Sequence, residues 1–294
     1  MIADYACVVG EGPLWHPVEQ RVYWTDIDTG RLFHYDPNTD AHGVIYQGPK
    51  VGGFTLQEDG SLLLFMDSGA VRVWRDGAFG ETIHDEILDE RTTRFNDVIA
   101  DPMGRVFCGT MPNADRLGRL YRMDHSGELT IVRDGVGCSN GMGFTTDLTT
   151  MYYTDTAART IFRFAYNAED GAISDETVFV RVAEGQGGPD GLTLDADGNV
   201  WSARWGGGCL VCHAAKDSRE LHRIPFPVPK VSSAIFGGPD LTDLYVTTAG
   251  GDRKETDGPF AGALFRVRIP GIRGVPEFRS RICRGTDAIP DPAG

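Results

Sequence analysis

The chain has 294 residues, of which 41% are hydrophobic and 24% charged, and its formal net charge is −14. This length and apolar content suit a folded domain with a large core and exclude an intrinsically disordered chain. The negative charge repels phosphate backbones and anionic lipid surfaces, so we expect no nucleic-acid partner and no membrane partner.

The first residues, MIADYACVVGEGP, lack the basic start and the apolar run of a secretory signal peptide. The densest apolar patch, Leu62–Met66, is far shorter than the roughly 20 residues that cross a bilayer. We therefore expect a cytoplasmic protein with reduced cysteines. Cys209–His213 reads as C-x-x-C-H, the string that attaches c-type haem. It lies in a strand-like run and has no second ligand pair for zinc, so we interpret it as two strand cysteines.

One pattern occurs six times along the chain: a short β-rich strand, a small turn and a second β-rich strand. In chain order the expected strand pairs are Arg21–Asp26 with Arg31–Tyr35, Leu62–Met66 with Ala70–Trp74, Arg105–Gly109 with Arg119–Met123, Met151–Asp155 with Thr160–Phe164, Asn199–Ala203 with Cys209–Cys212, and Asp243–Thr247 with Ala263–Val267. Repeats of this kind indicate one repetitive domain and not two separate ones.

The spacing of the repeats identifies the architecture. The apolar residues at the centre of each first strand are 40 to 48 residues apart; they are Tyr23, Leu63, Val106, Tyr152, Val200 and Tyr245. This is the period of a four-stranded propeller blade. We predict a six-bladed β-propeller with four-stranded antiparallel blades over residues 1–284, followed by a loose tail at 285–294. A helical period is conceivable only at Glu81–Glu90, which argues against α/β folds.

Four polar residues stand at a common distance before these repeats. Glu11, Asn96, Asn140 and Asp190 each precede the central residue of a first strand by 10 to 12 positions. In a propeller, equal offsets place residues at equal height, so we expect these four at one end of the central channel. Their two carboxylates and two amide oxygens are hard donors with a charge of −2, a set that suits a hard divalent cation such as Ca²⁺, Mg²⁺ or Mn²⁺.

Several strings around these residues carry a family resemblance. They are Gly10–Trp15, Arg94–Asp97, Gly109–Met111, Ser139–Gly141, Pro189–Gly191, Phe236–Gly238 and Ala261–Phe265. With them, the chain resembles the regucalcin/gluconolactonase family, which includes senescence marker protein, luciferin-regenerating enzyme and bacterial sugar lactonases. The resemblance runs from residue 10 to about 270.

The resemblance implies a six-bladed propeller with a single metal ion bound through Glu11, Asn140 and Asp190. It also implies that Arg94 and Asn96 bind the substrate, with Asn96 close to the metal, and that Asp190 is the catalytic acid/base. The expected cofactor is one divalent ion, with Ca²⁺ as the default and Mg²⁺, Mn²⁺, Zn²⁺ or Fe²⁺ as alternatives.

The expected activity is hydrolysis of a sugar lactone, such as gluconolactone, xylonolactone or arabinonolactone, to the aldonic acid. A phosphotriesterase-like hydrolase on the same metal site and a non-catalytic calcium-binding propeller are the alternatives. The loop Pro112–Gly118 is short, whereas family lactonases often carry a longer acidic loop there that contacts the sugar hydroxyls. Asn113 and Asp115 are the residues that could replace it, but no role is assigned to them, which leaves the lactone open. We expect a monomer or a weak homo-oligomer.

Two mechanisms remain open at this stage. In one, Asp190 takes a proton from the attacking water and returns it to the leaving alkoxide. In the other, a water held by the cation is the nucleophile and Asp190 only orients it. The seven histidines share no motif, so a Ser-His-Asp triad has no support.

Overall fold

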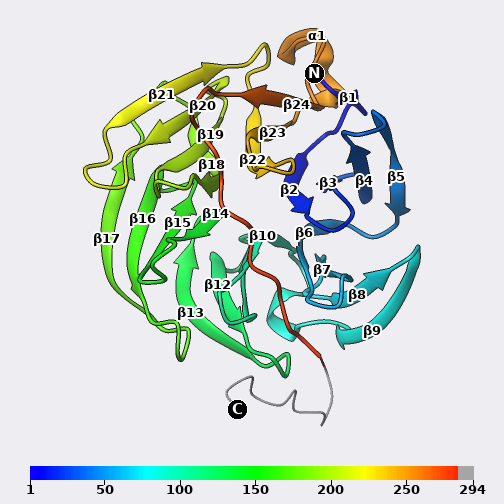
Figure 1. The fold of residues 1–294 in the computed structure, drawn as a ribbon. Coiled ribbons are helices and arrows are strands. Elements are labelled where there is room, and N and C mark those ends of the chain that lie inside the picture. Colours follow the sequence, from blue (N-terminus) through cyan, green and yellow to red (C-terminus); the bar gives the residue numbers. More distant parts are fainter. Residues whose placement is uncertain (284–294) are drawn as a thin grey trace.

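The computed structural model describes residues 1–283, which form a ring of six four-stranded antiparallel sheets around a central channel (Figure 1). The predicted six-bladed propeller is therefore confirmed. The tail expected at 285–294 lies outside the described residues.

Five blades are continuous in the chain, and each runs from an inner strand at the channel to an outer strand at the rim. Their strands are β2 (Gly10–His16), β3 (Arg21–Asp26), β4 (Arg31–Asp36) and β5 (Ala41–Gln47); β6 (Val51–Leu56), β7 (Leu62–Met66), β8 (Val71–Arg75) and β9 (Ala78–His84); β10 (Phe95–Ala100), β11 (Val106–Thr110), β12 (Gly118–Met123) and β13 (Leu129–Val136); β14 (Ser139–Phe144), β15 (Thr150–Asp155), β16 (Thr160–Tyr166) and β17 (Ile173–Arg181); β18 (Gly188–Leu194), β19 (Val200–Trp205), β20 (Cys209–His213) and β21 (Glu220–Pro225).

The sixth blade joins the two ends of the chain. From the channel outward, its first three strands are β22 (Val231–Gly237), β23 (Asp243–Thr248) and β24 (Ala263–Arg268). Its outer strand is the N-terminal β1 (Ala3–Asp4), which pairs antiparallel with β24. Because β2 also packs against β22, the six inner strands form a closed ring. Closure removes the free faces that an open array of blades would leave exposed.

The two strands predicted in each repeat are the two middle strands of each blade, where both faces are covered. β3, β7 and β23, for example, are buried along almost their whole length, whereas the rim strand β17 is largely exposed. The helical period suspected at Glu81–Glu90 gives only a 3-10 turn, η1 (Leu88–Glu90), because its first part belongs to β9.

The remaining helical segments are η2 (Gly251–Arg253) and α1 (Lys254–Asp257). None of the helices within residues 1–283 has the length and apolar content needed to span a membrane.

All six inner strands carry an irregularity at the same height. The pairing register shifts between Glu11 and Leu14 in β2 and between Asn140 and Met142 in β14, and corresponding shifts occur in β6, β10, β18 and β22. Each shift inserts one extra residue into the inner strand, which defines a β-bulge. A bulge lets consecutive residues aim at the channel, so this level of the ring can gather more polar side chains than regular strands allow.

Glycine in the bulges lets neighbouring inner strands approach. A Cβ on Gly141 would lie 2.4 Å from the backbone nitrogen of Leu192, and one on Gly191 would lie 2.1 Å from Ser233 Oγ. Both distances are far below van der Waals contact, so a larger residue would push adjacent blades apart. The Asn-Gly and Asp-Gly pairs thus serve blade packing as well as local turns.

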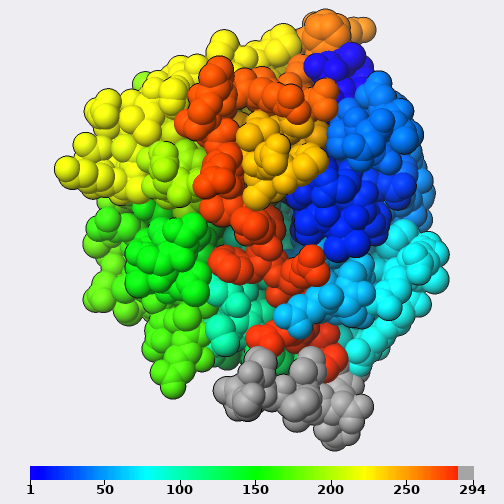
Figure 2. All heavy atoms as spheres, viewed as in Figure 1, coloured from blue at the N-terminus to red at the C-terminus, as the bar shows by residue number. Residues whose placement is uncertain are grey.

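A C-terminal strap, defined here as residues 269–283, runs across the face of the ring that lies at the carboxyl ends of the inner strands (Figures 1 and 2). It bonds to turns of several blades: Gly274 N donates to Leu241 O at 2.8 Å, and Arg281 N donates to Gly104 O at 2.8 Å. Ser280 Oγ and Thr55 Oγ1 lie 2.7 Å apart. The strap therefore covers the end of the channel at the carboxyl ends of the inner strands. The opposite end, which the strap does not cross, is called the open end below.

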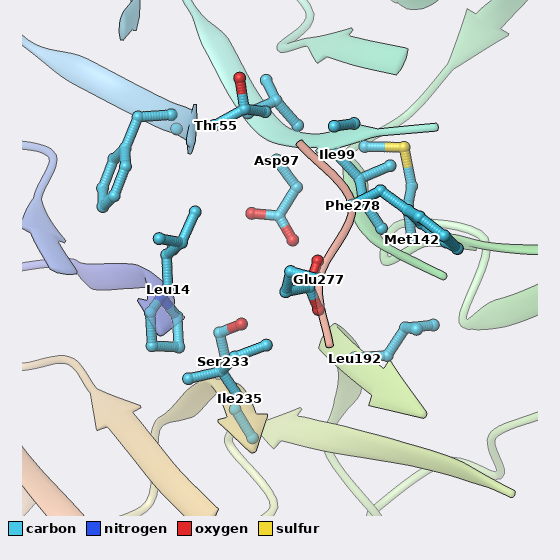
Figure 3. Close-up of a pocket in the computed structure, with 17 residues that line it drawn as sticks. Leu14, Thr55, Asp97, Ile99, Met142, Leu192, Ser233, Ile235, Glu277 and Phe278 are labelled. Carbon is cyan, nitrogen blue, oxygen red and sulfur yellow. The ribbon is translucent and has the colours of Figure 1, made fainter. Parts of the chain in front are cut away.

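Between the strap and the open end lies a cavity of about 70 Å³ that is lined by residues from all six inner strands. The carboxylates of Asp97, from β10, and Glu277, from the strap, both point into it (Figure 3). Burial raises the pKa of Glu277 to about 7, and burial also raises the pKa of Asp97 to about 7, against the lowering effect of Arg94. The ionised form of Glu277 is therefore disfavoured inside the channel.

This burial predicts how stability depends on pH. Because the folded-state pKa of Glu277 exceeds its usual value of 4.5, its contribution to stability is fully present below pH 4.5 and is lost as pH rises through 7. Glu277→Gln cannot ionise, so we expect it to be more stable than wild type at pH 8, by up to about 3 kcal/mol, and equally stable near pH 4. Urea denaturation across this pH range measures the difference.

Glu128→Gln provides the matched control, because Glu128 is exposed at the surface and its substitution should not change the pH dependence. A stability difference between Glu277→Gln and wild type that stays constant from pH 4 to 8 would contradict the assignment.

Candidate active site

The four polar residues predicted to share one level lie near the amino-terminal ends of four different inner strands. Glu11 is on β2, Asn96 on β10, Asn140 on β14 and Asp190 on β18. Each stands at or beside the bulge of its strand, and each is no more than 5% exposed. The structure therefore brings them together at the end of the channel opposite the strap.

Glu11 and Asp190 are two buried carboxylates that form no salt bridge with any described residue, although Arg94 lies close enough to act on Glu11. Burial raises the pKa of Glu11 well above its usual value, and the charges of Asp190 and Asp97 raise it further, while Arg94 lowers it. Burial also raises the pKa of Asp190, as does the charge of Asp97. Neither carboxylate takes part in any ion pair found within residues 1–283. A buried carboxylate pair of this kind is costly unless a cation balances it.

Backbone groups offer these carboxylates little compensation. The N–H of Gly12 donates to Glu11 Oε2 at 3.2 Å, and the N–H of Gly191 bonds to Asp190 and lowers its pKa, against the larger effect of burial. Arg94 is itself mostly buried, and burial lowers its pKa. Its Nη1 donates to the carbonyl of Phe95 at 2.9 Å and to Asn96 Oδ1 at 2.6 Å. Both hydrogens of this nitrogen are therefore bonded to residues of β10.

The two amides are fixed in orientation by hydrogen bonds. Asn96 Nδ2 donates to the carbonyl of Ser139 at 2.7 Å and to Asn140 Oδ1 at 3.1 Å. Arg94 donates to Asn96 Oδ1, so both amide hydrogens and one of the two oxygen lone pairs of Asn96 have protein partners. Asn96 thus supports Asn140 and links blade β10–β13 to blade β14–β17.

These residues fit a hard divalent cation. Glu11 and Asp190 supply two carboxylates that lack a counter-ion, and Asn140 supplies an amide oxygen whose second lone pair is free. Within residues 1–283 no group of three or more His, Cys, Asp and Glu side chains is arranged to hold a metal. A metal centre here therefore requires the amide oxygen of Asn140 to complete the two carboxylates.

The loop after β11 folds back on itself around Asn113. Asn113 Oδ1 accepts the backbone N–H groups of Asp115 and Arg116 at 2.9 and 3.0 Å, and its Nδ2 donates to Thr92 Oγ1 at 3.1 Å. Asn113 thus stabilises its own turn, and Asp115 is exposed.

Sequence reasoning assigned no role to Asp97, although it stands next to Asn96 in the Arg94–Asp97 string. Strict strand alternation would send neighbours to opposite faces, and only the register shift between Phe95 and Val98 in β10 lets both serve the channel. Glu277 carried no signal at all, because the strap has no repeat partner in the sequence.

The comparisons with known proteins agree with this architecture. Residues 9–250 match the family described as SMP-30/Gluconolactonase/LRE-like region. The chain is 52% identical to the pentonolactonase XacC of Haloferax volcanii over 291 residues, covering 97% of this chain and 98% of that protein. It is 33% identical to a 6-deoxy-6-sulfogluconolactonase of Pseudomonas putida over 272 residues, covering 90% and 93% of the two chains.

Two solved structures share the fold across nearly the whole chain. A luciferin-regenerating enzyme superposes with a TM-score of 0.85 at 27% identity, covering 94% of this chain and 96% of that one. Regucalcin from Agrobacterium tumefaciens, described as a calcium-binding protein, also gives 0.85, at 26% identity with 96% of both chains covered. The family match and the identity to XacC together show that the chain belongs to the SMP-30/gluconolactonase/LRE-like family.

Proposed function

We propose that the chain is a divalent-metal-dependent lactonase that hydrolyses a sugar lactone to the corresponding aldonic acid. The observation that carries the proposal is the buried pair Glu11 and Asp190, which lacks a cation and lies at the same open channel end as the amide oxygen of Asn140. The similarity to a pentonolactonase at 52% identity supports the substrate class and makes pentonolactones the first substrates to test.

Glu11, Asn140 and Asp190 are the residues that hold the metal in this proposal, with Ca²⁺ as the default ion. When bound, a divalent cation acts as a Lewis acid and stabilises the negative charge that ester hydrolysis builds on oxygen. The bulges fix the three ligands before any ion arrives, and such preorganisation lowers the cost of binding.

The chain's own groups account for the proton movements. Asp190 accepts a proton from the attacking water as the new carbon–oxygen bond forms at the lactone carbonyl. It then returns that proton to the ring oxygen as the ring ester bond breaks, so the product is a hydroxy acid. Arg94 has guanidinium donors beyond the Nη1 that holds Asn96, and we assign these to the hydroxyls and the developing carboxylate of the substrate.

Metal removal tests the proposal directly. Treatment with EDTA followed by gel filtration should lower the hydrolysis of xylonolactone, arabinonolactone and gluconolactone at least about 100-fold, because several kcal/mol of transition-state stabilisation is lost. Adding back Ca²⁺, Mg²⁺, Mn²⁺, Zn²⁺ or Fe²⁺ one at a time should restore the rate with at least one ion. Acid release measured with a pH indicator, less the spontaneous hydrolysis, gives the rate.

Full activity in protein shown by elemental analysis to be free of metal would refute the metal role. Tight ion binding without acceleration of any lactone would instead favour the non-catalytic calcium-binding alternative.

Asp190→Asn separates catalysis from folding. The amide keeps the shape of the side chain but can neither accept the proton nor supply the second negative charge, so we expect kcat/KM to fall by about 10² to 10⁴. The metal-free variant should be at least as stable as wild type, since it no longer buries an unpaired carboxylate. Lactonase assays and thermal melts measure the two effects.

Asp197→Asn is the matched control, because Asp197 is exposed in the turn after β18, at the strap end of the blade. Retention of near-normal activity by Asp190→Asn would rule out its proposed role as acid/base.

A further inference from the structure

Thr156 links the strands that carry two of the proposed metal ligands. It directly follows β15, in the turn to β16, and lies between β14 with Asn140 and β18 with Asp190. Its Oγ1 accepts a hydrogen bond from Asn140 Nδ2 at 2.8 Å and donates one to the carbonyl of Pro189 at 2.7 Å. A single hydroxyl therefore connects one ligand directly and the other through the peptide bond before it.

The first of these bonds determines which way the Asn140 amide faces. Asn140 Nδ2 has two hydrogens, and these go to Thr156 Oγ1 and to Cys138 Sγ, which lies 3.6 Å away. Asn140 Oδ1 accepts from Asn96 Nδ2 at 3.1 Å and keeps a second lone pair. With the nitrogen bonded to Thr156, the amide is held against turning over, so its oxygen and the free lone pair stay on the Asn96 side.

The second bond restrains the segment that delivers Asp190. Proline has a fixed φ, so a hydrogen bond to the carbonyl of Pro189 sets the plane of the peptide that enters Asp190. The packing is close here: a Cβ on Gly188 would lie 2.8 Å from Thr156 Cγ2. Blade β18–β21 thus contacts blade β14–β17 at this threonine.

Thr156 is itself held firmly in place. Its backbone N–H donates to the carbonyl of Cys138 at 3.0 Å. The preceding residue, Asp155, accepts the backbone N–H groups of Gly137 and Cys138, both at 3.1 Å. These bonds join the turn after β15 to the turn that leads into β14, so the Thr156 hydroxyl has little freedom to move.

The bonds form one chain with a single direction of donation. Arg94 donates to Asn96, Asn96 to Asn140, Asn140 to Thr156, and Thr156 to the carbonyl of Pro189. Once one group in this chain is fixed, the next donor keeps its hydrogen bond only in the orientation seen here. The chain begins at a residue assigned to substrate and ends beside Asp190, and it crosses three blades.

We propose that Thr156 is a positioning residue that sets the metal affinity of the site, by orienting Asn140 Oδ1 and holding the peptide that carries Asp190. This inference rests on the proposed function, because it takes Asn140 and Asp190 as ligands of a divalent cation. Hydrogen-bond partners of metal ligands commonly contribute to affinity in this way.

Titration of metal-stripped protein with Ca²⁺ alone and with Mn²⁺ alone, followed by isothermal calorimetry, tests the proposal. Thr156→Val keeps the size of the side chain but removes both hydrogen bonds, so Kd should rise about 10- to 100-fold. Thr156→Ser keeps the hydroxyl and should bind close to wild type. Circular dichroism of each metal-free variant establishes that it is folded, and Thr156→Ala replaces Thr156→Val if the valine does not fold.

Thr154→Val is the matched control for loss of a threonine hydroxyl, because Thr154 lies two residues earlier, in β15. Thr154 is fully buried and its Oγ1 has no hydrogen-bond partner, so its removal should leave Kd unchanged. Equal Kd values for Thr156→Val and wild type would overturn this inference and leave the proposed function standing. An equal loss of affinity in Thr154→Val and Thr156→Val would have the same consequence. If wild type binds neither ion, both this inference and the metal part of the proposed function fail. Lactone assays on the same protein then show separately whether the lactonase activity itself is present.

Discussion

Two buried carboxylates that form no salt bridge within residues 1–283, Glu11 and Asp190, are the feature on which this end of the channel depends. Glu11 and Asp190 come from blades on different sides of the ring, and each raises the free energy of the folded chain unless its charge is balanced. A folded structure tolerates two such carboxylates when a ligand of opposite charge offsets the cost of burying them. In the proposed metal centre, Asn140 adds an oxygen donor, and a network of hydrogen bonds fixes the orientation of its amide.

The propeller makes this arrangement possible. Six inner strands meet around one channel, and a bulge in each at the same height turns consecutive residues toward the axis. β1 completes the last blade and the C-terminal strap joins the turns at the other end. The proposed ligands therefore stand on a closed frame, and the strap covers the other end of the channel. Sites built on strands of a rigid frame hold their geometry better than sites on loops.

Much of this was accessible from the sequence because repetition is a strong signal. The period of the apolar residues from Tyr23 to Tyr245 predicted the number of blades, and the common offset of Glu11, Asn96, Asn140 and Asp190 predicted that they would meet. The parts that escaped prediction depend on single contacts. Asp97 reaches the channel only through the bulge in β10, and Glu277 arrives on a strap that has no counterpart in the repeats.

Side-chain orientation was also beyond the sequence. The expectation that Asn96 binds substrate stays a prediction, and the structure adds that both of its amide hydrogens are bonded to β14. Thr156 belongs to no motif, and its importance follows only from the two bonds that its hydroxyl makes. Motifs thus identified residue types and their level in the ring, whereas the direction of each donor emerged only from the packed structure.

The proposed metal centre is tested most directly with a crystal of the protein soaked in Mn²⁺ and measured at the manganese absorption edge. We expect one strong anomalous peak at the open end of the channel, about 2.0 to 2.6 Å from oxygens of Glu11, Asn140 and Asp190. A peak confined to other residues, or its absence from this site at saturating Mn²⁺, would contradict the claim that these buried carboxylates form a metal centre.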